Sequence, residues 1–556
     1  MITIQICGSS FLLPKNNAWN HLKKNFIIKN TTYGDISGAL FNSDSNDVVL
    51  IVLFFEDIVS NIQIDYDKLS ENFSSLFKSI TFRCMNSNMP TVLCWGKVNN
   101  IDPIRLAKKN TEEINIYGWF INQFQEMLRE HNSLYFINLN QIFSDKGYEN
   151  MFDDRNWYFA HCRVSILGIS HLANAVNSVL IRHFKTSSKV LVLDCDNTIW
   201  GGVIGEEGID KILLGQDGIG SAFIDFQREI KKLINQGVIL VLASKNNEED
   251  VWNVFDNHPS MILKKNDVVT WRIDWREKSE NIKSISYELD LGLDSFVFWD
   301  DNPLERDKVR SILPQVTTLD VPIDVYKWPS LIRKLENFAK FEVTSDDRNK
   351  TNQYHGRAKF VRDSSNISNI FDYLKGINLC PVATNLNDAL IGRAVQLCSK
   401  TNQYNFRTIR HKAEDLFKLQ SFNDDYCFLV SLTDNYGSHG IVALVCLHKL
   451  NERFLFIDTF LMSCRVLGRY LEAWVLNEIV RRAKNNSFDY LIGEFISTEQ
   501  NVVAKEFFIN YGFASIMAGS EFYETIIQSK LTAGGDIYLF SIKNSIIPYL
   551  DIYEKN

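Results

Sequence analysis

The stretch that decides the fold is Val190-Leu-Val-Leu-Asp194-Cys195-Asp196-Asn197-Thr198, in the middle part of the chain. Its unbroken apolar run is typical of a strand that is buried on both faces of a parallel sheet. Open sheets of this kind bind ligands at the carboxyl ends of their strands, and here two carboxylates follow the run. If the strand stays extended, Asp194 and Asp196 lie on one side, where their mutual repulsion favours a bound cation such as Mg²⁺.

Three later fragments supply further groups in a fixed order. Val238–Leu242 predicts a second buried strand, which is followed by the hydroxyl of Ser244. Lys278 stands at an expected helix start, and a third buried strand ends in Asp300 and Asp301. A hydroxyl, an ammonium and two pairs of acids at one sheet edge suit phosphoryl transfer.

This order of fragments resembles the haloacid dehalogenase (HAD) superfamily. The resemblance implies that Asp194 accepts phosphate or binds metal and that Asp196 is the general acid and base. It also implies that Lys278 balances the charge of the phosphate. It further implies a phosphate site of Ser244, Lys278, Asn197 and Thr198, and a Mg²⁺ shell of Asp194, Asp196, Asp300 and Asp301.

A narrower resemblance covers about Asp154 to Phe513. The tract Asp194–Gly208 is similar to the signature of the FkbH-like family, HAD subfamily IIIC, and Asp458–Arg469 continues the likeness. The resemblance implies an enzyme of polyketide-type biosynthesis that removes phosphate from 1,3-bisphosphoglycerate. Such enzymes pass the glyceryl group to the phosphopantetheine of a separate acyl carrier protein. Trp200 and the glycines up to Gly208 predict a mobile flap that shields the site from water.

Cys195, between the two aspartates, has two interpretations. The family resemblance implies a catalytic role in which its thiol holds glyceryl as a thioester, because an acyl phosphate is activated for thiolate attack. In an ideal strand, however, Cys195 points away from the acids into the core, where a free thiol is ordinary packing. The second interpretation makes the chain a small-molecule phosphatase with an inert Cys195. A non-catalytic scaffold that recruits a carrier is a third hypothesis for the whole chain.

The chain is not itself expected to be the carrier. Gly292-Leu-Asp-Ser295 matches the attachment pattern of carrier proteins. It runs directly into the strand that ends in Asp300, so there is no helical bundle around the serine.

The C-terminal part predicts strands at Cys427–Leu432, Ile441–His448 and Phe454–Phe460, which are followed by an amphipathic helix at Gly468–Ala483. The tract that leads into this helix, Arg465-Val-Leu-Gly468-Arg469-Tyr470, resembles the pyrophosphate-binding turn of GNAT acyltransferases. The resemblance implies that Arg465, Gly468 and Arg469 bind a carrier or its phosphopantetheine. Tyr470 replaces a small residue, which argues against acetyl-CoA binding. A structural domain and true acetyl transfer are the alternatives.

The N-terminal part faintly resembles the SGNH hydrolases. Gly8-Ser9-Ser10 stands where that fold has Gly-Asp-Ser, and Asp154 and His161 lack the usual Asp-x-x-His spacing. We therefore expect a domain for docking or scaffolding, with catalysis by Ser9 or Ser10 as the alternative.

These patterns predict an α/β protein of three domains. The domains are an SGNH-like α/β domain (1–187), a HAD-like Rossmannoid catalytic domain with a parallel sheet (188–341) and a GNAT-like α+β domain (377–556). A helical linker (342–376) is expected between the second and the third. The expected elements of the first domain include strands at Val48–Phe55, Thr91–Trp95 and Leu134–Leu139 and a helix at Glu113–His131.

Composition narrows the class of protein. Of 556 residues, 45% are hydrophobic and 23% charged, which excludes a disordered or fibrous chain. A net charge of −8 argues against a nucleic-acid partner. The ten cysteines are isolated, which excludes a disulfide scaffold and CxxC zinc pairs. Short apolar runs and a start without a basic segment predict a soluble, cytoplasmic protein with no membrane partner and no signal peptide.

Overall fold

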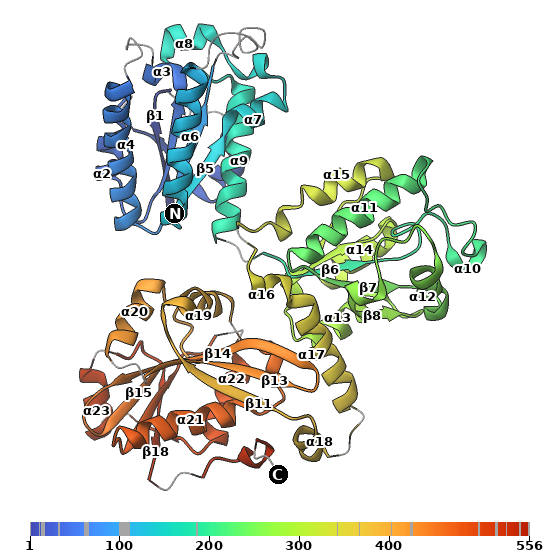
Figure 1. Ribbon diagram of the computed structural model, residues 1–556, viewed down its shortest axis with the longest axis vertical. Helices are drawn as coiled ribbons and strands as arrows, with labels where there is room; N and C mark the ends of the chain where they lie inside the picture. Colours follow the sequence, from blue (N-terminus) through green and yellow to red (C-terminus); the bar gives the residue numbers. More distant parts are fainter. Residues whose placement is uncertain are drawn as a thin grey trace. The chain divides into compact units, whose positions relative to one another are not determined.

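The computed structural model describes residues 2–10, 12, 17–31, 34–59, 66–98, 112–184, 187–341, 343–365, 367, 369–401, 403–422, 426–498, 501–517, 521–529, 531–543 and 546–553. The chain forms two compact units, Met1–Thr186 and Ser187–Asn556. Figure 1 colours the first unit blue to teal and the second green to red. Among the described residues, no helix has both the length and the apolar character that a bilayer span requires.

The first unit is built on a five-stranded parallel sheet (Figure 1) with the strand order β2-β1-β3-β4-β5. Its strands are β1 (Ile2–Gly8), β2 (Phe26–Asn30), β3 (Val48–Phe54), β4 (Thr91–Gly96) and β5 (Leu134–Asn138). Its helices are α1 (Asn20–Lys23), α2 (Ile36–Asn42), α3 (Phe55–Val59), α4 (Tyr66–Asn86), α6 (Glu112–Glu130), α7 (Leu139–Ser144), α8 (Asp154–Ala160) and α9 (Ile166–Phe184). The expected strands and the expected helix are confirmed, and each of their ends lies within one residue of the expected position.

Helices cover both faces of this sheet. Along β3, Val48 and Leu50 pack on the side of α1, α7 and α9, whereas Val49 and Ile51 pack on the side of α2, α4 and α6. The strand is buried along its whole length because successive side chains enter different layers. The unit is therefore a three-layer α/β fold, which agrees with the α/β class expected for this part of the chain.

The second unit begins with another five-stranded parallel sheet, here called the central sheet, with the order β10-β9-β6-β7-β8. Its strands are β6 (Val190–Leu193), β7 (Ile239–Ser244), β8 (Val268–Ile273), β9 (Phe296–Trp299) and β10 (Thr317–Thr318). Its helices are α10 (Ile204–Glu207), α11 (Gly218–Asn235), α12 (Glu248–Asn257), α13 (Lys278–Leu289), α14 (Pro303–Ile312) and α15 (Trp328–Arg333). Leu191 and Leu193 face α11, and Val190 and Val192 face α13, which explains the apolar run of β6.

The segment expected as a helical linker forms α16 (Ser345–Arg348), α17 (Lys350–Ser365) and α18 (Ile370–Gly376). Helix α17 is a packing element between two sheets of the second unit. Tyr354 and Ala358 join the core of the central sheet, whereas Phe360 joins the core of the C-terminal sheet. Arg357 adds an ion pair to Asp290 at 3.4 Å.

The C-terminal sheet has eight strands in the order β11-β13-β14-β15-β16-β18-β17, with β12 paired to β15. They are β11 (Cys380–Asn385), β12 (Tyr404–Asn405), β13 (Cys427–Asp434), β14 (Gly437–Lys449), β15 (Phe454–Met462), β16 (Tyr490–Phe495), β17 (Ala514–Ser515) and β18 (Asp536–Ser541). The helices are α19 (Asp388–Lys400), α20 (Ala413–Phe422), α21 (Leu471–Asn485), α22 (Val502–Asn510) and α23 (Glu521–Gln528). The three expected strands are confirmed. Helix α21 starts three residues later than expected, because Gly468 (φ +86°) and Tyr470 (φ 54°) have left-handed backbone conformations.

Candidate active site

The central sheet brings most of the predicted acids, the hydroxyl and the lysine to one edge. Asp194 follows β6, Ser244 ends β7 and Asp300 follows β9. The three strands are parallel neighbours and their register aligns their carboxyl ends, so these residues lie side by side. Lys278 is the first residue of α13, just beyond β8. This is the edge at which open parallel sheets bind ligands.

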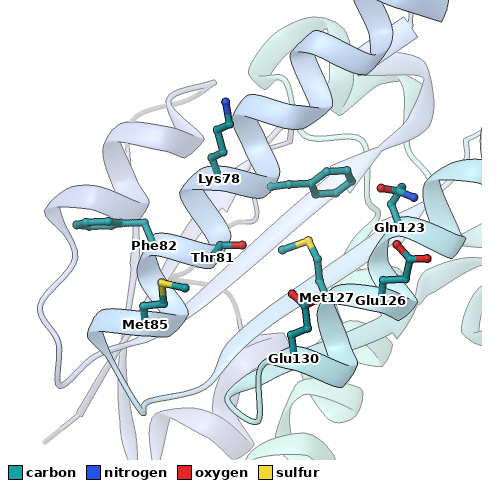
Figure 2. Close-up of a pocket in the computed structure, with 9 residues that line it drawn as sticks. Lys78, Thr81, Phe82, Met85, Gln123, Glu126, Met127 and Glu130 are labelled. Carbon is teal, nitrogen blue, oxygen red and sulfur yellow. The ribbon is translucent and has the colours of Figure 1, made fainter.

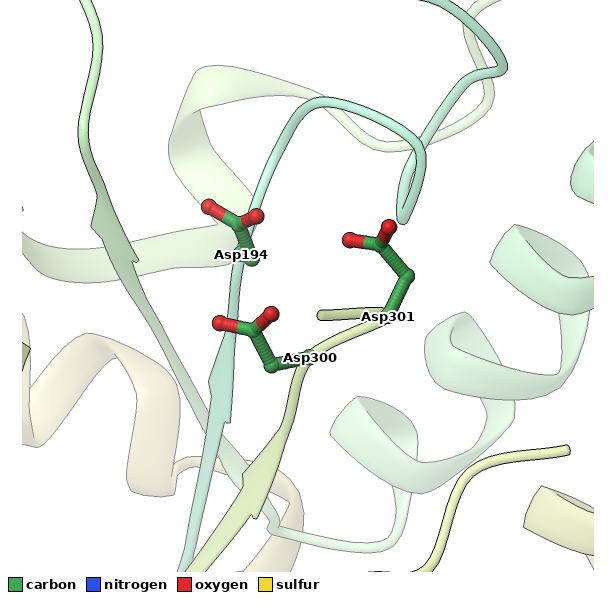
Figure 3. A group of neighbouring side chains, drawn as sticks. All are labelled: Asp194, Asp300 and Asp301. Carbon is green, nitrogen blue, oxygen red and sulfur yellow. The ribbon is translucent and has the colours of Figure 1, made fainter. Parts of the chain in front are cut away.

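Three carboxylates at this edge form a group that can hold a metal ion (Figure 3). One oxygen from each of Asp194, Asp300 and Asp301 lies within 4.8 Å of the others. Burial, followed by repulsion from Asp194, raises the pKa of Asp300 to about 7 and also raises the pKa of Asp301. A cation relieves such repulsion, and Mg²⁺ prefers oxygen ligands. The donor set therefore fits a magnesium ion.

Lys278 supplies the positive charge within this group. Its Nζ lies 3.0 Å from Asp194 Oδ1 and 2.5 Å from Asp300 Oδ2, and the side chain is buried. Burial alone would lower the pKa of Lys278, but the charges of the two aspartates raise it above its usual value. One ammonium among three carboxylates leaves negative charge for a divalent cation to neutralise.

Asp196 lies outside this group, although the sequence placed it in the metal shell. Strand β6 ends at Leu193, so Asp196 does not continue the extended alternation that the prediction assumed. The next residue, Asn197 (φ 52°), has a left-handed conformation. Asp196 Oδ1 accepts hydrogen bonds from Trp200 Nε1 at 3.0 Å and from the Ile204 backbone N–H at 3.1 Å. Its Oδ2 accepts one from Asn246 Nδ2 at 2.8 Å. Burial is the main cause that raises the pKa of Asp196.

The two residues after Asp196 have different partners. Asn197 supports the flap, defined here as residues 200–208, and Thr198 contacts Asp301. Asn197 Oδ1 accepts a hydrogen bond from the Gly202 backbone N–H at 2.8 Å. The Thr198 side chain is fully buried, and its hydroxyl donates to Asp301 Oδ1 at 3.3 Å. The structure therefore gives both of these expected phosphate ligands partners within the protein.

Cys195 lies in the core rather than at the edge. Its exposed fraction is 0%, and it belongs to the same apolar cluster as Leu191 and Leu193, as strand alternation predicts. Burial, and then the charge of Asp194, raises the pKa of the thiol well above its usual value, although a hydrogen bond with Ser244 opposes this shift. Ser244 is itself buried. This environment favours the interpretation of Cys195 as a core-filling residue.

The expected carrier-binding arginines of the C-terminal sheet are turned inward. Arg465 donates a hydrogen bond to Gln353 of α17, and Arg469 Nε donates to Asp434 Oδ2 at 2.8 Å. Both side chains are buried. Gly468, which lies between the two arginines, has a left-handed backbone conformation that suits glycine. The guanidinium groups of this turn are engaged in contacts within the second unit.

Strands β15 and β16 separate towards their carboxyl ends, and another segment of the chain lies between them there. These strands pair only over Phe454–Ile457 and Tyr490–Gly493. Beyond that point β12 pairs with Leu461 and Met462 of β15, and the Ile496 backbone N–H donates to the Phe406 carbonyl oxygen at 2.8 Å. Main-chain hydrogen bonds therefore hold the segment of β12 between the two diverging strands.

The N-terminal serines have structural contacts. Ser9 Oγ accepts a hydrogen bond from the Phe54 backbone N–H at 3.1 Å. Ser10 Oγ accepts one from the Arg163 backbone N–H at 3.0 Å and donates to the His161 carbonyl oxygen at 3.4 Å. Asp154 and the side chain of His161 are exposed at opposite ends of α8.

A groove in the first unit lies between α4 and α6 (Figure 2). It is lined by Phe77, Lys78, Thr81, Phe82, Met85, Gln123, Glu126, Met127 and Glu130. None of these residues belongs to the carboxylate group of the central sheet.

Two site residues were not assigned a role from the sequence. Asn246 holds Asp196, and its position two residues after Ser244 is a signal that would have justified a role for it. Arg306 Nη1 donates to the carbonyl oxygens of Asp300 at 2.8 Å and Asp301 at 2.7 Å and so supports the acid-bearing loop. Its place one turn into α14 carries no comparable signal.

The chain is similar to a solved structure that contains a phosphatase domain. The N-terminal part of the protein BF1531 from Bacteroides fragilis, a phosphatase-containing structure in complex with Mg, has 25% identity and a TM-score of 0.52. The match covers 60% of this chain and 93% of that one. No family model and no curated protein matches the sequence.

Two further solved structures match a shorter part of the chain. Rv2747 from Mycobacterium tuberculosis, in complex with CoA and NLQ, has 15% identity and a TM-score of 0.23, and the match covers 29% of this chain and 98% of that one. A GNAT-family acetyltransferase from Staphylococcus aureus Mu50 has 14% identity and a TM-score of 0.24, with 30% and 100% covered. At these scores the two matches say nothing about activity.

Proposed function

We propose that the chain is a magnesium-dependent phosphatase whose active site is the carboxylate group of the central sheet. The observation that carries the proposal is the convergence of Asp194, Asp300 and Asp301 around Lys278 at the carboxyl ends of parallel strands. The similarity to the BF1531 structure, which contains a phosphatase domain in complex with Mg, supports the same metal and the same reaction.

Each residue of the site has a different role in the proposed reaction. Bound Mg²⁺ would neutralise charge on the phosphoryl oxygens and on the acids. Asp194 attacks phosphorus, and the bond from phosphorus to the leaving oxygen breaks with its electron pair on that oxygen. Asp196 gives its proton to the leaving oxygen, then takes a proton from the water that releases inorganic phosphate from Asp194. Lys278 holds Asp194 in place and balances its charge.

The first test measures phosphate release from small phosphorylated substrates. Asp194→Asn should abolish release, because it removes the nucleophile without changing the size of the side chain. The matched control is Asp320→Asn, since the Asp320 side chain is 94% exposed. Equal activity in wild type and Asp194→Asn would contradict the proposal. No release by the wild type would instead support the non-catalytic scaffold.

The narrower proposal concerns the substrate and the acceptor. The family resemblance supports 1,3-bisphosphoglycerate as the donor and the phosphopantetheine of a separate acyl carrier protein, bound near Arg465, Gly468 and Arg469, as the glyceryl acceptor. In the thioester route, the Cys195 thiolate would attack the acyl carbonyl and the bond to phosphate would break. The full burial of Cys195 favours the alternative, a small-molecule phosphatase with an inert thiol.

Intact-mass measurement separates the two routes. After incubation with 1,3-bisphosphoglycerate, the thioester route predicts a glyceryl adduct on the wild type that Cys195→Ala lacks. The inert-thiol route predicts no adduct and unchanged phosphate release in Cys195→Ala. Cys427→Ala is the control, since Cys427 is a buried thiol of the C-terminal sheet.

A further inference from the structure

The side chain of Asn246 connects two segments of the candidate active site. We infer that Asn246 is a positioning residue that aims one oxygen of Asp196 at the leaving group of the substrate. Asn246 follows β7, and its Nδ2 donates to Asp196 Oδ2 at 2.8 Å across 50 residues of sequence. The inference rests on the proposed phosphatase function, in which Asp196 protonates the leaving oxygen.

The hydrogen bonds that Asp196 accepts leave few directions in which its carboxylate can carry a proton. An ionised carboxylate has about four lone-pair positions, two on each oxygen. Trp200 Nε1 and the Ile204 backbone N–H occupy those of Oδ1. Asn246 occupies one position of Oδ2, so the described part of the chain leaves a single lone pair of that oxygen to carry the transferred proton. The direction of that lone pair depends on where Asn246 holds Oδ2.

The amide of Asn246 is itself fixed. Its exposed fraction is 6%, and its Oδ1 accepts a hydrogen bond from the Asn247 backbone N–H at 3.0 Å. That contact makes the oxygen the acceptor and directs Nδ2, the donor, toward Asp196. Asn246 beside β7 and the two donors of the flap thus hold the Asp196 carboxylate in place from different parts of the chain.

A positioning role predicts an effect that depends on the leaving group. Alkyl phosphates expel a basic alkoxide, which needs a proton as the bond to phosphorus breaks. Aryl phosphates with acidic phenols expel a stable phenolate, which needs little help. A misdirected Asp196 therefore slows the first class much more than the second, whereas general damage to the fold slows both equally.

The experiment compares kcat/KM of the full chain with Mg²⁺ on p-nitrophenyl phosphate and on glycerol 3-phosphate. Asn246→Ala removes the donor, and Asn246→Asp keeps the shape but places a carboxylate against Asp196. Both variants should lose at least about tenfold more activity on glycerol 3-phosphate than on p-nitrophenyl phosphate. In an Asp196→Asn background, Asn246→Ala should change the activity by less than about twofold, because the two residues act as a unit.

The control is Asn247→Ala, the neighbouring asparagine, whose side chain caps α12 through the Glu249 backbone N–H. It should show no dependence on the leaving group, even if its thermal stability falls. Equal losses on both substrates in Asn246→Asp, or additive losses in the double variant, would overturn the inference while leaving the phosphatase proposal intact. Absence of activity in the wild type would overturn both.

Discussion

At the scale of the residue, the positive charge of Lys278 allows the acids of the site to be buried close together. It is 4% exposed and contacts Asp194 and Asp300. Lys278→Met removes this cation and leaves two buried carboxylates without compensation. We expect the unfolding free energy in EDTA to fall by about 3 to 5 kcal/mol, measured by urea denaturation, and phosphate release to be lost.

Lys308→Met is the control for this prediction. The Lys308 side chain is 49% exposed and pairs with Glu277 at 3.3 Å. Its replacement should change the unfolding free energy by less than about 1 kcal/mol. Equal stability of the two variants would show that Lys278 does not compensate buried charge.

Asp300 gives the metal-free protein a predicted pH dependence. Burial and the charge of Asp194 raise the pKa of Asp300 to about 7, above that of an unfolded chain. The folded state therefore binds the proton more tightly, and this contribution to stability is complete below about pH 4 and lost as the pH rises through 7. Urea denaturation in EDTA should show decreasing stability between about pH 5 and pH 8.

Two comparisons check the origin of this slope. Asp300→Asn should flatten it, because the titrating group is gone. Mg²⁺ should also flatten it, since the metal stabilises the ionised carboxylates. A slope that survives in Asp300→Asn would assign the titration to another group.

The sequence could predict some contacts of the site but not others. Asp194 and Asp300 each follow an apolar run, so parallel pairing was enough to place them together. The expectation for Asp196 assumed that the strand stays extended, whereas β6 ends at Leu193 and Asp196 lies outside the carboxylate group. The place of Asn246 two residues after Ser244 indicates that it lies at this edge, but no local pattern reveals that its partner is Asp196, 50 residues away.

At the scale of the element, the flap requires a glycine at position 202. Gly202 has φ +98°, and its backbone N–H donates to Asn197. Gly202→Ala strains this turn by about 1 to 3 kcal/mol, and an added Cβ would lie 2.6 Å from Glu207 Oε2. We expect kcat for phosphate release to fall about tenfold or more, because the flap supplies two of the donors to Asp196.

Gly205→Ala is the matched control in the same flap. Gly205 lies in α10, and a Cβ there would meet no atom within 4 Å. This variant should retain wild-type kinetics. An equal loss of kcat in both variants would mean that the flap tolerates no added methyl group, whatever the backbone conformation.

The sequence predicted the packing of some elements but not of others. Apolar runs predicted the buried strands, because helices on both faces demand apolar residues at every position. Helix α17 was expected as part of a linker because its sequence is polar. Its packing comes from Tyr354, Ala358 and Phe360, which enter the cores of two different sheets, and no single periodic face signals that arrangement.

At the scale of the whole molecule, the residues of the proposed active site belong to one compact unit. Asp194, Asp300, Asp301 and Lys278 lie within Ser187–Asn556. We expect a chain of residues 187–556 to keep its phosphatase activity and its dependence on Mg²⁺. Loss of activity in a fragment that still unfolds cooperatively would show that the first unit contributes to the reaction.

The magnesium site is tested by a titration of phosphate release with Mg²⁺ after treatment with EDTA. A magnesium-dependent site predicts no activity without metal and full recovery with Mg²⁺. It also predicts that Asp301→Asn requires at least about tenfold more Mg²⁺, whereas Asp320→Asn follows the wild-type curve. Activity that survives EDTA, or an Asp301→Asn curve identical to that of the wild type, would contradict a magnesium-dependent site at the edge of the central sheet.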